Sequence, residues 1–219
     1  MESKVVRWAD ADKSDDFVKQ KLKLNGLSGD ALKSNKNYKY FKQFVDIKEG
    51  NQRDVWLKQE VSTSDVWTKL GFGNVKTQEE LTKASGTDAF QVYLRYADSV
   101  DNRAVAKSYN KEEIVPVISV DSSWAEKKAR MESWVKANKP AAYVMMVLGL
   151  HDLSPAAVKS NKNLKLFAEY LQTNKKSLGN ADILLKHLMG LENLSPKAMT
   201  NSENYKTYKY LSDLIQNNK

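Results

Sequence analysis

The sequence predicts an all-α protein built from tandem helical repeats, and three observations support this prediction. A segment of fifteen residues that begins at Leu27 recurs at Leu153 with ten identities and no gap, and a looser copy begins at Leu194. Around each copy, apolar residues follow the spacing of an amphipathic helix. A β-like run is confined to 113–120, where Pro116 would interrupt a strand, so we expect a connector there.

The repeat extends upstream of this segment in the same register. The 126-residue offset between the first two copies also places Trp8 on Trp134, and a 48-residue offset places Trp8 on Trp56. Three of the five tryptophans therefore share one repeat position. The predicted segments are a first unit at 1–50, a second, divergent unit at 51–100, a helical connector at 101–130, a third unit at 131–171 and a fourth at 172–219.

The third unit shows the expected order of helices most clearly. Pro140 precedes an apolar helix at 141–150, because a proline at a helix start loses no hydrogen bond. A short second helix follows Ser154, whose hydroxyl can cap its free amides. A closing helix then presents an apolar stripe that includes Phe167 and Tyr170.

The other units repeat this order with departures. Ser28 and Ser195 occupy the capping position in the first and fourth units, whereas the second unit departs after Val75 and the fourth lacks the tryptophan. Because such small units bury little surface alone, we expect them to stack into an elongated array, each lending a helix to its neighbour's core. Aromatic residues at matching positions form the predicted core: Trp8, Trp56, Trp134, Phe41, Tyr93, Phe167, Tyr170 and Tyr208.

Residue composition removes most catalytic and metal chemistries. The chain has no cysteine and two histidines, His151 and His187, in separate segments. Asp152 and Ser154 lie near His151, but a triad requires three groups that converge in space, and Ser154 is already explained as a helix cap. We therefore predict no enzymatic activity, no metal site and no cofactor.

The net charge of +8 comes mainly from lysine, because only five of the 35 basic residues are arginine. Proteins that recognise nucleic acids usually use arginine for bidentate contacts, so dispersed lysine favours solvated helix faces. No apolar run approaches the roughly 20 residues that span a membrane. A basic helical scaffold that binds RNA or an anionic membrane surface is the alternative function.

Together, a tryptophan-bearing helix, a leucine-bearing helix, a capped short helix and a closing helix with paired aromatics resemble the WY domain. That fold is typical of secreted RXLR effectors of oomycete plant pathogens such as Phytophthora, and consecutive units resemble the tandem L-WY arrangement. The resemblance covers nearly the whole chain. Neither the RXLR motif nor its acidic EER companion is present, which fits a fragment whose leader has been removed.

The resemblance implies a secreted virulence effector that acts in the cytoplasm or nucleus of the host plant cell. Such effectors bind host proteins and suppress or redirect immunity, and their partners include phosphatases, kinases, ubiquitin ligases, autophagy components and immune receptors. The motif shared by the family is its core, so the resemblance transfers no binding residue to this chain.

Two sequence features are candidates for contact with a partner. Trp124 lies outside the shared register, so it is either packed locally or an interface anchor. Phe44 and Ile47 frame an aromatic-x-x-aliphatic stretch similar to peptides that bind autophagy ubiquitin-like proteins by strand addition. Strand addition needs an extended, exposed backbone, whereas the alignment of Phe44 with Tyr170 favours a helix.

Overall fold

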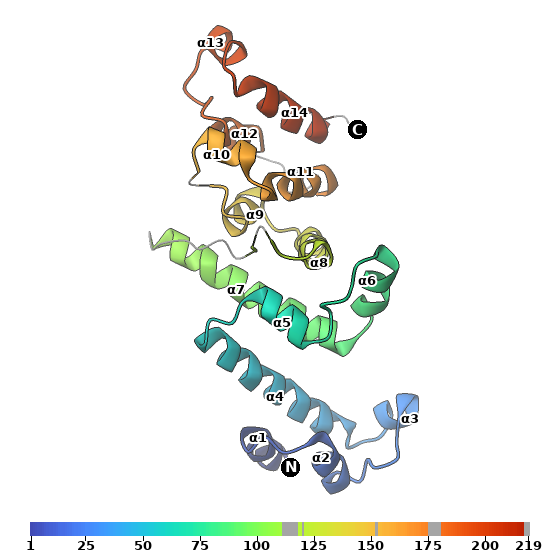
Figure 1. The fold of residues 1–219 in the computed structure, drawn as a ribbon. Coiled ribbons are helices and arrows are strands. Elements are labelled where there is room, and N and C mark those ends of the chain that lie inside the picture. The colour runs from blue at the N-terminus through green and yellow to red at the C-terminus, as the bar shows by residue number, and fades with distance from the viewer. Residues whose placement is uncertain (111–117, 120, 152, 175–180, 217–219) are drawn as a thin grey trace. The chain divides into compact units, whose positions relative to one another are not determined.

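A computed structural model gives the fold of the chain over residues 1–110, 118–119, 121–151, 153–174 and 181–216. These residues form fourteen helices and no strand (Figure 1). The all-α prediction is therefore confirmed. Asp152 and most of the β-like run at 113–120 lie outside the described residues.

The described helices fall into two compact units, Met1–Val61 and Ser62–Lys219. The first unit contains α1 (Glu2–Asp10), α2 (Asp15–Lys21), α3 (Gly29–Lys33) and α4 (Tyr38–Lys58). The second unit contains α5 (Thr63–Lys69), α6 (Gln78–Ser85), α7 (Asp88–Tyr109), α8 (Trp124–Lys136), α9 (Ala141–Val147), α10 (Pro155–Ser160), α11 (Asn163–Thr173), α12 (Ala181–Leu188), α13 (Pro196–Thr200) and α14 (Tyr205–Gln216).

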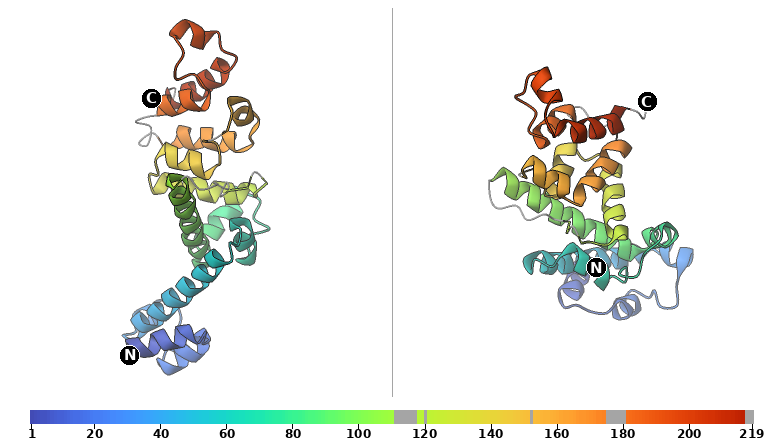
Figure 2. Two further views of the ribbon diagram at one scale, coloured as in Figure 1. Left: turned by 90° about the vertical axis from the view of Figure 1, so that its left-hand side faces the viewer. Right: turned by 45° about the horizontal axis from the view of Figure 1, so that its top comes forward.

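In the first unit, α1 lies against α4, and the two helices share one apolar core (Figure 2). Trp8 packs edge-on against Phe17 at the margin of this core, with ring centroids 6.1 Å apart. Ser14 begins α2 by accepting a hydrogen bond from the amide of Phe17 at 3.2 Å. The fully enclosed core residues are Val5, Ala9, Val18, Leu22, Leu24, Phe41 and Phe44.

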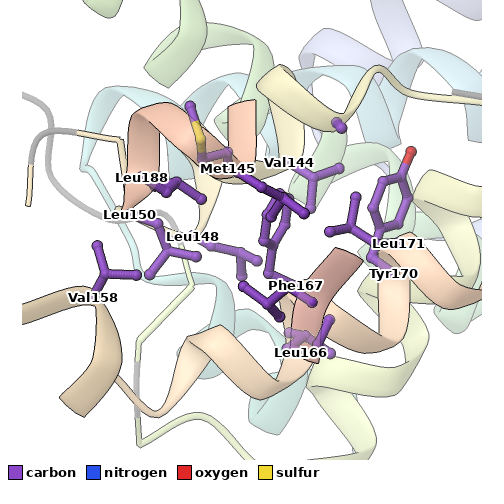
Figure 3. Close-up of a cluster of buried hydrophobic side chains, with 14 of the residues drawn as sticks. Val144, Met145, Leu148, Leu150, Val158, Leu166, Phe167, Tyr170, Leu171 and Leu188 are labelled. Carbon is purple, nitrogen blue, oxygen red and sulfur yellow. The ribbon is translucent and has the colours of Figure 1, made fainter. Parts of the chain in front are cut away.

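In the second unit, α11 lies at the centre of a large apolar core, because it packs against α8, α9, α10 and α14. Figure 3 shows part of this core, where Leu148 and Phe167 lie among side chains of α9, α11 and α12. Another aromatic group forms around Trp67 of α5. The ring centroid of Trp67 lies 4.8 Å from those of Phe72 and Tyr93.

Each tryptophan of the shared register is followed by the same helix-ending geometry. A residue with positive φ lies four positions after the tryptophan, and the next amide donates to the tryptophan carbonyl, as in a Schellman motif. The positive-φ residues are Asp12, Glu60 and Asn138, with φ of 44°, 51° and 50°. The donors are Lys13, Val61 and Lys139, at 2.9, 3.0 and 2.9 Å.

A second feature recurs at the start of the closing helices. In three of the sequence repeats, an asparagine side-chain amide donates to a backbone carbonyl at the end of the leucine-bearing helix. The donors are Asn37, Asn163 and Asn204, and the acceptors are the carbonyls of Leu22, Leu148 and Met189, at 2.9, 3.3 and 3.0 Å. The bond ties two helices of the same unit together.

The predicted serine caps form in two of the sequence repeats, and in a third the serine makes no cap bond. Ser154 and Ser195 each accept a hydrogen bond from a first-turn amide at 3.3 Å, as expected. Ser28 stands before α3 without a side-chain cap bond. Gly29 replaces the proline of the other two copies and has a φ of 54°, so the first turn of α3 departs from theirs.

Two segment boundaries expected from the sequence fall inside helices. Residue 50 lies within α4, and residue 100 lies within α7. The backbone continues as one helix through each of these boundaries. In the predicted connector, α7 runs to Tyr109 and α8 begins at Trp124. The stacking of units into an array stays a prediction.

Candidate functional site

The structure encloses most of the aromatic residues predicted as core. Trp134, Phe41, Tyr93, Phe167 and Tyr170 are buried. The remaining three, Trp8, Trp56 and Tyr208, are only half-buried. The hydroxyl of Tyr208 explains its position, because it donates to Asp182 Oδ1 at 2.6 Å near the surface.

The sequence repeat at 51–100 buries a different tryptophan from the one expected. Trp67, outside the shared register, is 2% exposed, whereas Trp56 is half-buried on α4. Phe72, Phe90 and Tyr93 surround the Trp67 ring. Edge-to-face aromatic contacts of this kind contribute about 0.5–1.5 kcal/mol beyond the buried area.

The described residues do not bring the candidate catalytic groups together. Ser154 is used as the cap of α10, and Asp152 lies outside the described residues. His187 is exposed and pairs with Glu192, with Nδ1 and Oε2 2.8 Å apart. Over the part of the chain that the structure describes, no group of three potential metal ligands occurs.

The structure contradicts the interpretation of Phe44 and Ile47 as an extended binding peptide. Both residues lie on α4, where Phe44 is fully buried and Ile47 packs against the same core. A buried helical segment cannot add as a strand to a partner's sheet. This stretch is therefore part of the core of the first unit.

In the first unit, an open hollow of about 410 Å³ lies beside α2. Its lining mixes the apolar side chains of Phe17, Leu24 and Leu27 with Asp16 and Lys19. The lining includes no histidine and no nucleophile paired with a base. The hollow therefore brings together no groups that would carry out a reaction.

A buried polar network joins α5, α7 and α8 in the second unit, and Glu126 of α8 is its centre. The Glu126 carboxylate is 1% exposed and accepts three hydrogen bonds from hydroxyl groups. The donors are Thr63 at 2.8 Å, Ser64 at 2.7 Å and Tyr93 at 2.9 Å. Each bond crosses between helices, so the network fixes the start of α8 against its two neighbours.

One turn further along α8, Arg130 forms an ion pair with Asp101 of α7. Both side chains are 1% exposed, and Trp134 Nε1 donates to the second Asp101 oxygen at 2.8 Å. Burial raises the pKa of Asp101 to about 6, against the opposing effects of Arg130 and Trp134. Burial opposes the charge of Arg130, but Asp101, Tyr93 and Glu126 outweigh it and raise the pKa of the guanidinium.

The burial of this network limits it to a structural role. A substrate cannot reach carboxyl groups that are 1% exposed, so the arrangement is suited to holding helices and not to acid–base chemistry. Breaking one partner of a buried charge pair typically costs about 3–5 kcal/mol, which makes the helix arrangement specific. Sequence reasoning missed the network, because its members come from three separate helices.

Trp124 is the first residue of α8 and is 45% exposed. The two alternatives from the sequence, local packing and an interface anchor, therefore both stay predictions. Ser123 caps the helix by accepting a hydrogen bond from the Glu126 amide at 3.1 Å. The backbone that carries Trp124 is therefore held by this cap, while 45% of the residue is open to solvent.

Lysines and one aspartate lie near Trp124. Lys127 follows one turn later on α8, and Lys162 pairs with Asp121 at 3.1 Å. Burial lowers the pKa of Lys127, Lys162 lowers it further, and Asp121 opposes both. No described helix is both long and apolar enough for a bilayer crossing.

The chain is similar to two curated proteins of Phytophthora infestans (strain T30-4). It is 28% identical over 159 residues to a "Secreted RxLR effector protein", a match that covers 73% of this chain and 65% of that protein. It is 30% identical over 101 residues to "RxLR effector protein Avr1", covering 46% of this chain and 43% of that protein. Its homologues are RxLR effectors.

The resemblance to oomycete RXLR effectors is thereby confirmed, and the assignment of single units as WY domains stays a prediction. The matches span less than two thirds of the length of each RxLR relative. No protein-family model matches the chain. No solved structure matches it significantly either.

Proposed function

We propose that this chain is a virulence effector that acts in the cytoplasm or nucleus of the host plant cell. In this proposal it binds a host protein and thereby suppresses or redirects immunity. The observation that carries the proposal is the similarity to a secreted RxLR effector over 73% of the chain. A helical scaffold alone would imply only an interaction surface.

The chemistry of the described residues supports binding in preference to catalysis. The described carboxyl groups with the strongest burial, Glu126 and Asp101, are bonded to neighbouring helices and closed to solvent. The histidine His187 is engaged with a surface glutamate. An effector of this composition acts through its surface, where lysines and a few exposed apolar side chains lie.

Affinity purification from plant tissue tests this proposal. The tagged chain is expressed in leaves, and the washes are repeated at low salt, at high salt and after nuclease. Because an interface with an apolar centre largely survives salt, we expect one stoichiometric host protein under all three conditions. Enhanced pathogen growth on the expressing tissue, relative to tissue with tag alone, tests the virulence role.

The same washes distinguish the alternative of a basic scaffold. Binding that depends on phosphates falls steeply with salt, because counterions are released on association. Recovery that vanishes with nuclease or moderate salt would therefore favour RNA or an anionic membrane as the ligand. In that outcome the effector would not act by binding a host protein.

A further inference from the structure

The geometry points to the surface around Trp124 as the docking site for an acidic segment of the host partner. The indole is the apolar anchor, and Lys127 and Lys162 provide the charge contacts. This inference rests on the proposed function, since it names the surface and the partner chemistry that the effector would use.

Trp124 has the properties of a preorganised anchor. It starts α8, the helix whose inner face carries the buried carboxylate of Glu126 and the ion pair of Arg130. The preceding turn is also held, because the hydroxyl groups of Ser64 and Ser122 lie 2.8 Å apart in a hydrogen bond. A rigid support lowers the entropy lost on association, so an exposed ring there gives more binding energy than one on a loose loop.

Trp124 is the one tryptophan of the chain with a largely exposed surface. Three of the other four tryptophans sit in the shared register and Trp67 fills an aromatic core, whereas 45% of Trp124 is open to solvent. Tryptophan is the residue type most enriched among side chains that dominate interface energy. Its apolar surface would be covered when a partner docks.

The charges around the ring favour an acidic partner. Lys162 pairs with Asp121 at 3.1 Å, and Lys127 lies close enough for the charges of both to affect it. Lys165, also exposed, follows one turn after Lys162 on α11. Lys128 and Glu169 neutralise each other at 2.8 Å, which leaves the patch positive.

A polypeptide fits this patch better than a phosphate backbone or a bilayer. Over the described residues, the patch combines the ring of Trp124 with Lys127, Lys162 and Lys165, and Asp121 lies among them. Arg130, the arginine of α8, is buried and cannot reach a phosphate. An acidic peptide can place one carboxylate against each lysine and keep away from Asp121. The closely spaced phosphates of a nucleic acid or a bilayer would also lie against Asp121, which repels them.

Site-specific photo-crosslinking tests this inference in the full chain. A photoreactive amino acid replaces Lys165 at the edge of the patch, which keeps Trp124, Lys127 and Lys162, or, as a matched control, it replaces the exposed Ile183 on α12. After irradiation in plant tissue, we expect position 165 to capture a host protein through a segment rich in Asp and Glu. Trp124→Ala should lower that yield about tenfold or more, with an unchanged circular dichroism spectrum.

Charge exchange supplies the second measurement. The pair Lys127→Glu and Lys162→Glu should abolish capture, and reversal of the acidic segment in the partner to lysine should restore it. Capture from position 183 alone, or a yield unaffected by Trp124→Ala, would overturn the docking site and leave the proposed function standing. Nucleic acid or lipid captured at position 165, or no host protein from either position, would overturn both.

Discussion

Glu126, Arg130 and Trp134 stand four residues apart on α8, so their side chains share one face of the helix. That face points inward: the three residues are 1%, 1% and 2% exposed. The stability of the second unit therefore depends on a tryptophan that is both an apolar core residue and a hydrogen-bond donor.

Trp134→Ala should lower the free energy of unfolding by about 3–5 kcal/mol, because it leaves a large cavity and removes the donor to Asp101. Urea unfolding followed by circular dichroism measures the change. Trp134→Phe is the matched control, since it keeps a ring but not the indole N–H, and we expect a loss nearer 1–2 kcal/mol. A loss below about 1 kcal/mol for the alanine variant would contradict the burial of this residue.

Asp101 should give the stability a defined pH dependence. Its pKa is about 6 in the folded chain because of burial, against about 3.9 for an unperturbed aspartate, so between these values the native state holds a proton that the unfolded chain has released. The corresponding stability is fully present below pH 4 and is lost as the pH rises through 6. Its slope is at most about 1.4 kcal/mol per pH unit.

The comparison of wild type with Asp101→Asn isolates this contribution from those of other carboxyl groups. Urea unfolding at intervals from pH 4 to 7 should show stability that falls more steeply with pH in the wild type than in the variant. The difference should be constant above pH 7. Parallel profiles across the whole range would show that Asp101 is ionised throughout.

The histidines provide a residue-level test of the proposal that no catalysis is involved. Replacing His151 and His187 together by Ala should leave host-partner recovery and the effect on pathogen growth unchanged within about twofold, because neither belongs to a described catalytic cluster. Circular dichroism verifies the fold of the double variant. Loss of biological effect in a folded double variant would restore the enzyme interpretation.

At the scale of single elements, helix ends show why some features could be predicted and others could not. The caps at Ser154 and Ser195 follow from local sequence, because serine and the next proline suit only a helix start. The sequence repeat at 51–100 also has a local signal for a helix start, since Thr77 and Glu80 form a capping box. Thr77 does not align with the capping serines of the other repeats, so the repeat pattern alone does not predict this cap.

The buried network lies beyond this kind of inference. Glu126 and Arg130 at a spacing of four read in sequence as an exposed ion pair on a helix surface. Their partners Thr63, Tyr93 and Asp101 are supplied by α5 and α7. Only the packing of α5, α7 and α8 shows that the face with Glu126 and Arg130 points inward and is not solvated. The same holds for Trp67, whose burial depends on rings from α7.

The ends of the leucine-bearing helices lead to an element-level prediction. Lys23 has a φ of 58°, in the left-handed region where the equivalent residues of the other units are Gly71, Gly149 and Gly190. Lys23→Gly should raise the stability of the first unit by about 0.5–1 kcal/mol, since the strain exceeds the added unfolded-state entropy.

The reverse exchange is the matched control for that prediction. Gly149 has a φ of 65°, so Gly149→Lys should destabilise the second unit by about 1–2 kcal/mol. Thermal unfolding of both variants beside the wild type measures the two shifts. A lower melting temperature for Lys23→Gly would show that the lysine side chain makes a contact worth more than the strain.

At the scale of the whole molecule, the two compact units each contain an apolar core of their own. The core of the second unit draws its buried residues from Ile118 to Leu211, all within that unit. Its α5 is also capped internally, because Ser62 accepts a hydrogen bond from the Asp65 amide at 3.0 Å.

A fragment of residues 61–219 should therefore fold alone and unfold in one cooperative transition, because α7 and α8 pack both against α5 and α6 and against the helices of the core at 118–211. Circular dichroism and urea unfolding test its folding. Since Trp124, Lys127 and Lys162 all lie in this fragment, it should also capture the host partner from position 165 within about threefold of the full-chain yield. A folded fragment that loses capture would place an essential part of the interface in residues 1–60, and a fragment without cooperative unfolding would show that the second unit depends on the first.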